Sequence, residues 1–167
     1  MKTYTTEYVK RENYGKFGFR SLEEAARARL GNPLPIALIT LNDLKAYKPG
    51  TGARQLLKDA RALWFPVMVG DEVRAKLEMV QKDSRWTAGE FGGARTATNV
   101  ARAAAGLTDK LAAMNIKPLE KLSLVRVPAL NAAFLLVESP SGEHMVPATT
   151  AVQKFGLEEG RIYPARE

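Results

Sequence analysis

The stretch from residue 64 to residue 93 constrains the fold most, because it alternates like strands and shows no helical spacing. An apolar run over residues 64–69 meets Gly70-Asp71, and over residues 73–79 apolar side chains then alternate with charged ones. A period of two predicts a half-buried strand, and a two-residue loop that starts with glycine predicts a type II′ hairpin. A second turn at 83–85 leads into a third strand. The stretch therefore predicts a three-stranded antiparallel meander.

Capping signals and one apolar run predict the elements before the meander. Ser21, with Glu24 three residues later, forms a capping-box pattern and predicts a helix that Gly31 ends. The apolar run 36–41 follows two prolines and predicts a strand that is buried on both faces. Two short helices are expected next, one capped by Asn42 and one over residues 52–60.

The second half of the chain begins with a helical pattern and continues with strands. Residues 94–115 carry apolar side chains at helical spacing, and Gly106 is expected to split this helix in two. The later expected elements are strands at 122–128, 131–139 and 143–148 with a hairpin turn at 140–142, a helix at 150–156 that starts at Thr150, and a strand at 160–164.

This order of elements predicts the fold class. Strands cluster in runs joined by hairpins, so we expect an α+β fold with a mainly antiparallel sheet, built from the meander and a second hairpin block and covered by helices. Alternating βαβ units with a parallel sheet are the less favoured alternative, because 64–91 contains no helix. A chain of 167 residues suits a single domain. We expect residues 1–20 to be an aromatic and basic segment that docks, through Phe17 and Phe19, on a single domain over residues 21–167.

The composition excludes several kinds of chemistry. The chain has no cysteine, which excludes thiolate catalysis and cysteine-rich zinc sites. The one histidine, His144, follows a hairpin turn and is expected at the surface, and the paired carboxylates fall at helix starts or turns. No catalytic residue, metal site or cofactor is therefore predicted.

Charge and hydropathy give expectations about compartment and partners. The net charge is +7, and residues 1–60 hold eleven Lys and Arg against six Asp and Glu. No run approaches the roughly 18 apolar residues of a membrane span, and residues 1–30 lack the apolar centre of a signal peptide. We expect a protein that is cytoplasmic as written, or extracytoplasmic if an export signal was removed from it.

Rings and arginines near the meander suggest a ligand site. Large rings on neighbouring strands form core pairs in most sheets, but they can also line a pocket in which an arginine orients the ligand. The sequence FGGAR, residues 91–95, could also expose backbone amides to an anion at a helix start. The predicted ligand-binding residues are Trp64, Trp86, Phe91 and Arg95.

The N-terminal segment suggests a different partner, because aromatic rings beside positive charges can bind single-stranded nucleic acid. The residues that would do so are Tyr8, Lys10, Arg11, Tyr14 and Lys16. We favour instead a non-enzymatic α+β module that binds a small molecule or a protein partner. One version of this hypothesis is that the chain is the mature part of an exported bacterial-type protein. The alternatives are a nucleic-acid-binding protein that uses this segment, and an enzyme or subunit that acts on an anionic substrate through Arg95.

Overall fold

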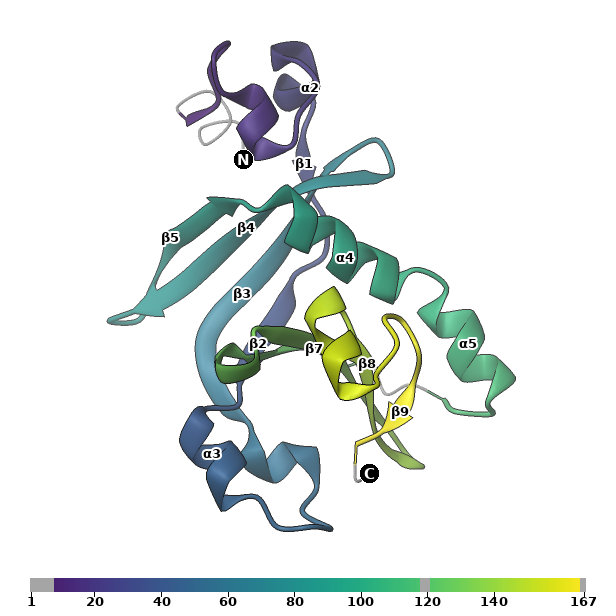
Figure 1. Cartoon of the computed structure of the whole chain (residues 1–167). Helices are drawn as coiled ribbons and strands as arrows, with labels where there is room; N and C mark the ends of the chain where they lie inside the picture. Colours follow the sequence, from purple (N-terminus) through teal and green to yellow (C-terminus); the bar gives the residue numbers. More distant parts are fainter. Residues whose placement is uncertain (1–7, 118–120, 166–167) are drawn as a thin grey trace. The chain divides into compact units, whose positions relative to one another are not determined.

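The computed structural model describes residues 8–117 and 121–165 (Figure 1). The chain divides into two compact units, and each unit combines two separate stretches of sequence. Unit 1 contains Met1–Leu34 and Ala62–Ala101, and unit 2 contains Pro35–Arg61 and Arg102–Glu167. The expected division of the chain at residue 20 stays a prediction.

Unit 1 is built on the meander. Strand β3 pairs with β4 and β4 with β5, both antiparallel, and the short strand β1 pairs with β3. Gly70 alone has a positive φ in the first turn, at 58°, as a type II′ hairpin requires. The predicted meander is confirmed. Its elements are η1 (Tyr14–Phe17), α2 (Leu22–Ala26), β1 (Arg29–Leu30), β3 (Lys58–Val69), β4 (Glu72–Lys82), β5 (Arg85–Gly92) and α4 (Ala94–Ala104), with the first residues of β3 and the last of α4 belonging to unit 2.

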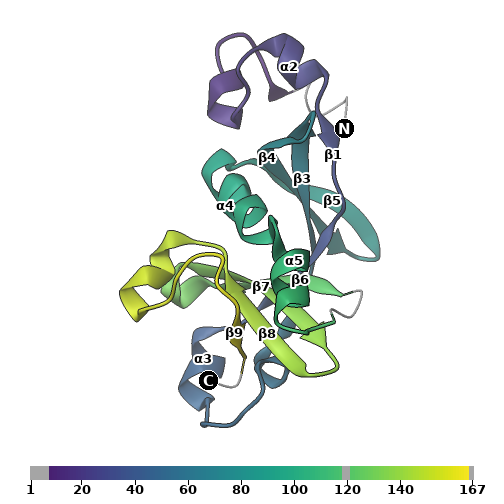
Figure 2. The ribbon, with the colours of Figure 1, turned by 90° about the vertical axis from the view of Figure 1, so that its right-hand side faces the viewer.

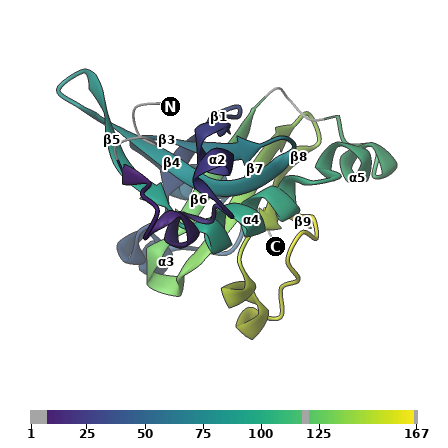
Figure 3. The same ribbon diagram turned by 90° about the horizontal axis from the view of Figure 1, so that it is seen from above.

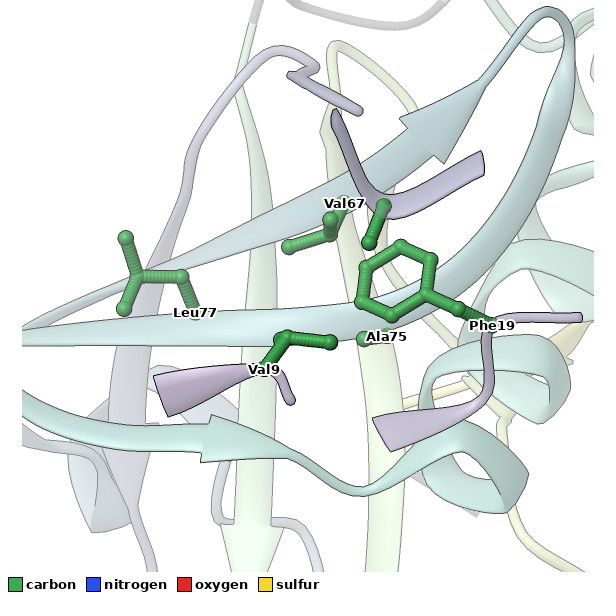
Figure 4. Close-up of a cluster of buried hydrophobic side chains, with 6 residues drawn as sticks. Val9, Phe19, Val67, Ala75 and Leu77 are labelled. Atoms are coloured by element: carbon green, nitrogen blue, oxygen red, sulfur yellow. The ribbon is translucent and has the colours of Figure 1, made fainter. Parts of the chain in front are cut away.

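The core of unit 1 lies between the meander and the N-terminal segment. Val9 and Phe19 pack on Val67, Ala75 and Leu77 (Figure 4). Figure 3 shows the N-terminal segment, in purple, over the strands of the meander. Burying a phenylalanine side chain stabilises a fold by about 1.5–3 kcal/mol, so this segment contributes to the core of unit 1.

Unit 2 contains a sheet in the order β2-β6-β7-β8-β9. Figure 2 labels four of these strands, β6 to β9. The pair β2–β6 is parallel, and the pairs from β6 to β9 are antiparallel. One of its cores contains Val125, Leu136 and Val152. The elements are β2 (Leu34–Leu38), α3 (Leu41–Ala46), η2 (Ala53–Leu56), α5 (Leu107–Ala113), β6 (Leu122–Val127), η3 (Pro128–Leu130), β7 (Ala132–Ser139), β8 (Gly142–Pro147), η4 (Thr150–Phe155) and β9 (Tyr163–Pro164).

The predicted fold class is confirmed: the protein is α+β with mainly antiparallel strands. The second hairpin block appears as β7 and β8, which join at Ser139 and Gly142. The split of the long helix is also confirmed, because Gly106 separates α4 from α5 with a φ of 66°. A glycine adopts this backbone conformation without the penalty that a β-carbon brings.

Two predicted helices are shorter in the structure. The helix at Ser21 ends at Ala26 instead of Gly31, because Arg29 and Leu30 leave it to pair with β3. Only one 3-10 turn, Ala53–Leu56, forms within residues 52–60, since Lys58 already begins β3. In both cases strand pairing outweighs local helix propensity.

One predicted cap is wrong, and one predicted helix has a different form. Helix α3 is capped by Thr40 and not by Asn42: Thr40 Oγ1 accepts a hydrogen bond from the Asp43 amide, and Asp43 accepts one from the Thr40 amide. The helix expected at Thr150 is a 3-10 helix without a side-chain cap. The hydroxyl of Thr149 instead accepts from the Ala133 amide, which ties this helix to β7.

Candidate binding site at the edge of the meander

The strand register divides the meander side chains between two faces. Val67, Ala75 and Leu77 lie on the face that the N-terminal segment covers, which we call the N-terminal face. Trp64 pairs with Glu78, and each of them is next in sequence to a member of the pair Phe65–Leu77. Side chains alternate along a strand, so Trp64 and Glu78 lie on the opposite face. Side chains on β5 follow the same division until Gly89, which has no partner on β4 and forms a β-bulge.

A small cavity lies at the outer edge of β5. It measures about 230 Å³ and is lined by Tyr8, Phe17, Ala88, Gly89, Glu90 and Phe91. No residue of β4, the neighbour of β5 in the sheet, lines this cavity, so the cavity lies on the outer side of β5. We call this cavity the edge pocket.

Aromatic packing holds the apolar wall of the edge pocket. The ring of Phe17 stacks on Phe91 with the centroids 5.1 Å apart, and Phe19 lies 6.5 Å from the same ring. Gly18 connects the two phenylalanines, and a β-carbon there would lie 2.2 Å from the Arg74 carbonyl oxygen. The close approach of the backbone at Gly18 therefore allows both rings to reach the meander.

The opposite face of the meander carries a group of ion pairs. Lys76 Nζ pairs with Glu78 on the same strand and, at 2.7 Å, with Glu90 on β5. The alternation pattern predicts a half-buried strand with its charged side chains toward solvent, but Lys76 is only 5% exposed. Glu78 and its β3 partner Trp64 are also buried on this face. Both faces of β4 are therefore covered, and the prediction of a solvent-facing side is wrong.

A second ion pair joins α2 to β4. Glu24 accepts from Arg74 Nε at 2.9 Å and from the Arg20 amide. Burial raises the pKa of Glu24, but these hydrogen bonds and the Arg74 charge outweigh burial, so the pKa is lowered overall. The ionised carboxylate therefore anchors α2 to the meander.

The four predicted ligand-binding residues do not meet at one place. Trp64 is 2% exposed and lies on the opposite face, whereas Phe91 lies on the N-terminal face in the edge pocket. Trp86 is 45% exposed on β5, and Arg95 is exposed in the first turn of α4. Of the four, Phe91 alone lines the edge pocket.

The two glycines of FGGAR have a structural explanation. Gly92 and Gly93 both have positive φ angles, of 122° and 62°. A β-carbon on Gly92 would lie 3.3 Å from the ring of Phe17, and one on Gly93 would lie 2.8 Å from Lys76 Cε. The turn into α4 therefore requires glycine at both positions, irrespective of any bound anion.

The proposed nucleic-acid residues are divided between surface and core. Lys10, Arg11 and Lys16 are exposed, and Tyr8 is 50% exposed. Tyr14, however, packs against the unit 1 core together with Phe17. Of the predicted stacking rings within the described residues, Tyr8 is therefore the more exposed one.

His144 is buried, so its predicted surface position is wrong. It is 8% exposed, because β8 pairs with β7 on one side and with β9 on the other. Within residues 8–117 and 121–165, its Nδ1 atom has no hydrogen-bond partner. A cavity of about 270 Å³ borders His144 and Glu143, and Glu143 accepts from the Arg54 amide at 3.1 Å.

Sequence reasoning missed most of the edge pocket. An isolated glycine inside a strand pattern is a signal for a bulge, and Gly89 provided it. The stack of Phe17 on Phe91 joins positions far apart in the chain, and nothing local in the sequence indicates it.

Comparison of the chain with protein-family models, with curated proteins and with solved structures finds no match. Across the described part of the chain, no helix has the length and apolar character needed to cross a membrane. The same residues contain no group of three His, Asp or Glu side chains that could hold a metal ion. The fold class and the edge pocket therefore carry the functional argument.

Proposed function

We propose that the protein is a binding module that takes up an extended segment of a partner protein along β5, with an apolar side chain of that segment in the edge pocket. The observation that carries this proposal is the position of the pocket beside a strand edge. Within the described residues, β5 ends the strand order and pairs with β4 alone. An extended peptide can add to such an edge through backbone hydrogen bonds, while pockets beside it select side chains.

The size and lining of the edge pocket favour a side chain over a free small molecule. Ligand pockets usually measure about 300–1,000 Å³, and this one measures about 230 Å³. Phe17 and Phe91 supply apolar walls, Tyr8 an exposed ring and Glu90 a carboxylate. This lining suits an aromatic or aliphatic group and disfavours an anionic one, which argues against the anionic-substrate alternative.

The experiment uses N-acetyltryptophanamide as a probe for one aromatic side chain with its flanking amides. Titrated into the ¹⁵N-labelled full chain, the probe should shift the amide resonances of residues 88–91. We expect a Kd in the millimolar range, which corresponds to a binding free energy of about −4 kcal/mol. Tyr8→Ala should weaken this binding severalfold. Tyr47→Ala is the matched control, because Tyr47 is a tyrosine of similar exposure, 41%, in unit 2. Unchanged resonances at 88–91, or equal effects of the two variants, would reject the proposal.

A further inference from the structure

We infer that the partner segment is β5 of a second copy of this chain, so that two copies pair edge to edge about a two-fold axis at Thr87. The inference rests on the proposed function, because it names the partner for the same strand edge. Three features favour one register: which backbone groups of β5 point outward, which side chains lie on each of its faces, and where its two charges lie.

The turn between β4 and β5 defines which backbone groups point outward. Lys82 pairs with Arg85 across the two-residue loop Asp83-Ser84, whose φ angles are 47° and 65°. In such a turn the two flanking residues share a hydrogen bond, and hydrogen-bonded pairs then alternate along the ladder. Arg85 and Thr87 therefore bond toward β4, while the N–H and C=O groups of Trp86 and Ala88 point to the outer edge.

These outward groups favour pairing Trp86 with Ala88 of the second copy. Consider an antiparallel pair in which Thr87 of one copy lies opposite Thr87 of the other. The outward N–H and C=O groups of Trp86 in each copy then meet those of Ala88 in the other copy. Trp86 and Ala88 lie on the same face of β5, as residues directly opposite each other in a sheet must. Since Ala88 is small and lines the edge pocket, each indole would lie at the pocket of the other copy.

Two charges on β5, Arg85 and Glu90, complement each other in this register. Arg85 and Glu90 lie on the same face of β5, because their β4 partners Lys82 and Glu78 lie four positions apart. In this register Arg85 of one copy lies opposite Gly89 of the other, next to Glu90, and the bulge places Glu90 on the same face as Arg85, within reach of its long side chain. Both side chains are exposed, although Glu90 also pairs with Lys76. A two-fold axis gives this contact twice.

The side chains of β5 do little to prevent edge pairing. Protected edges carry proline, several charges, bulges or very short strands. The edge of β5 has one bulge, at Gly89, but it has eight residues, no proline and an indole that is 45% exposed. Thr87 opposite Thr87 is a favourable cross-strand pair. A second copy therefore matches this edge from Arg85 to Gly89, the part that lies before the bulge and at it.

The first test uses the absence of cysteine from the chain. In the inferred register the two Thr87 positions form a non-hydrogen-bonded pair, with α-carbons about 4.5 Å apart, a separation that suits a disulfide. The full-length variant Thr87→Cys should cross-link in a glutathione buffer at least tenfold faster than Ala88→Cys, which keeps the indole and whose two copies are not opposite each other. Equal rates would overturn the register.

The second test changes the charges of Arg85 and Glu90 and measures the molecular mass in solution by sedimentation at a series of protein concentrations. The wild-type chain should show a concentration-dependent dimer, and Arg85→Glu and Glu90→Arg should each be monomers. An equimolar mixture of the two variants should regain the dimer, since each contact then joins opposite charges.

If Glu90→Arg disturbs folding through Lys76, Thr87→Arg replaces it and should give a monomer, because it places like charges on the axis. A wild-type chain that remains monomeric at all concentrations would overturn the inference, and if N-acetyltryptophanamide still shifts residues 88–91, the proposed function stands.

Discussion

Gly18 shows at the residue scale how the N-terminal segment reaches the meander. Its φ is 87°, and a β-carbon would lie 2.2 Å from the Arg74 carbonyl oxygen and 2.7 Å from Ala94 Cβ. The first neighbour is backbone and cannot rotate away. The position therefore requires glycine for its backbone conformation and also for space.

We expect Gly18→Ala to lower the free energy of unfolding by about 2–4 kcal/mol, the combined effect of a strained φ and a steric clash. Gly50→Ala is the control: Gly50 has nearly the same φ, 86°, with no atom within 4 Å of the added β-carbon, so about 1 kcal/mol is expected. Urea unfolding of both variants measures the difference. Similar losses would show that no close approach exists at Gly18.

Lys76 provides a second residue-scale prediction. Lys76→Met removes a buried cation from between two carboxylates and should cost about 3 kcal/mol or more. Glu90→Gln alters the more exposed end of the same group and should cost under about 1 kcal/mol. Chemical denaturation measures both values. A Lys76→Met variant as stable as Glu90→Gln would contradict the burial of Lys76.

At the element scale, the capping box of α3 makes stability depend on pH. The Lys58 side chain first, and then the hydroxyl and amide of Thr40, lower the pKa of Asp43 to about 2. Because the folded pKa lies below the ordinary value, the stabilisation is complete above about pH 4 and is lost as the pH falls toward 2. Asp43→Asn should lower the thermal midpoint at about pH 6 and much less at about pH 2. A pH-independent difference would contradict this cap.

The elements that sequence predicted well are those whose signals are local. The alternation over 73–79, the glycine-led turn at Gly70 and the glycine break at Gly106 act within a few residues, and the corresponding elements are present. The helix after Ser21 was predicted too long because the pairing of Arg29 with Met68 joins distant parts of the chain. The burial of Lys76 and the edge pocket depend on similar distant contacts, which no short window of sequence contains.

At the scale of the whole molecule, unit 1 depends on the first stretch of the chain. A chain that begins at Ser21 lacks Val9, Phe17 and Phe19, which pack on the meander core. We expect its thermal midpoint to fall by about 10 °C or more, since each kcal/mol corresponds to about 2–4 °C for a protein of this size. Tryptophan fluorescence measures this, because Trp64 and Trp86 both belong to unit 1. An unchanged midpoint would contradict the role of these rings in the core.

The two tryptophans also give the protein a built-in optical reporter. Trp64 is enclosed on one face of the meander, while Trp86 stands at its rim, so the native emission contains two populations of indole that differ in their access to dissolved quenchers. Iodide should extinguish the light from Trp86 and leave that from Trp64. A partner that covers the edge of β5 should protect Trp86 from iodide, as Trp64 already is. Binding at this edge can therefore be followed from the intrinsic fluorescence, without attaching a dye.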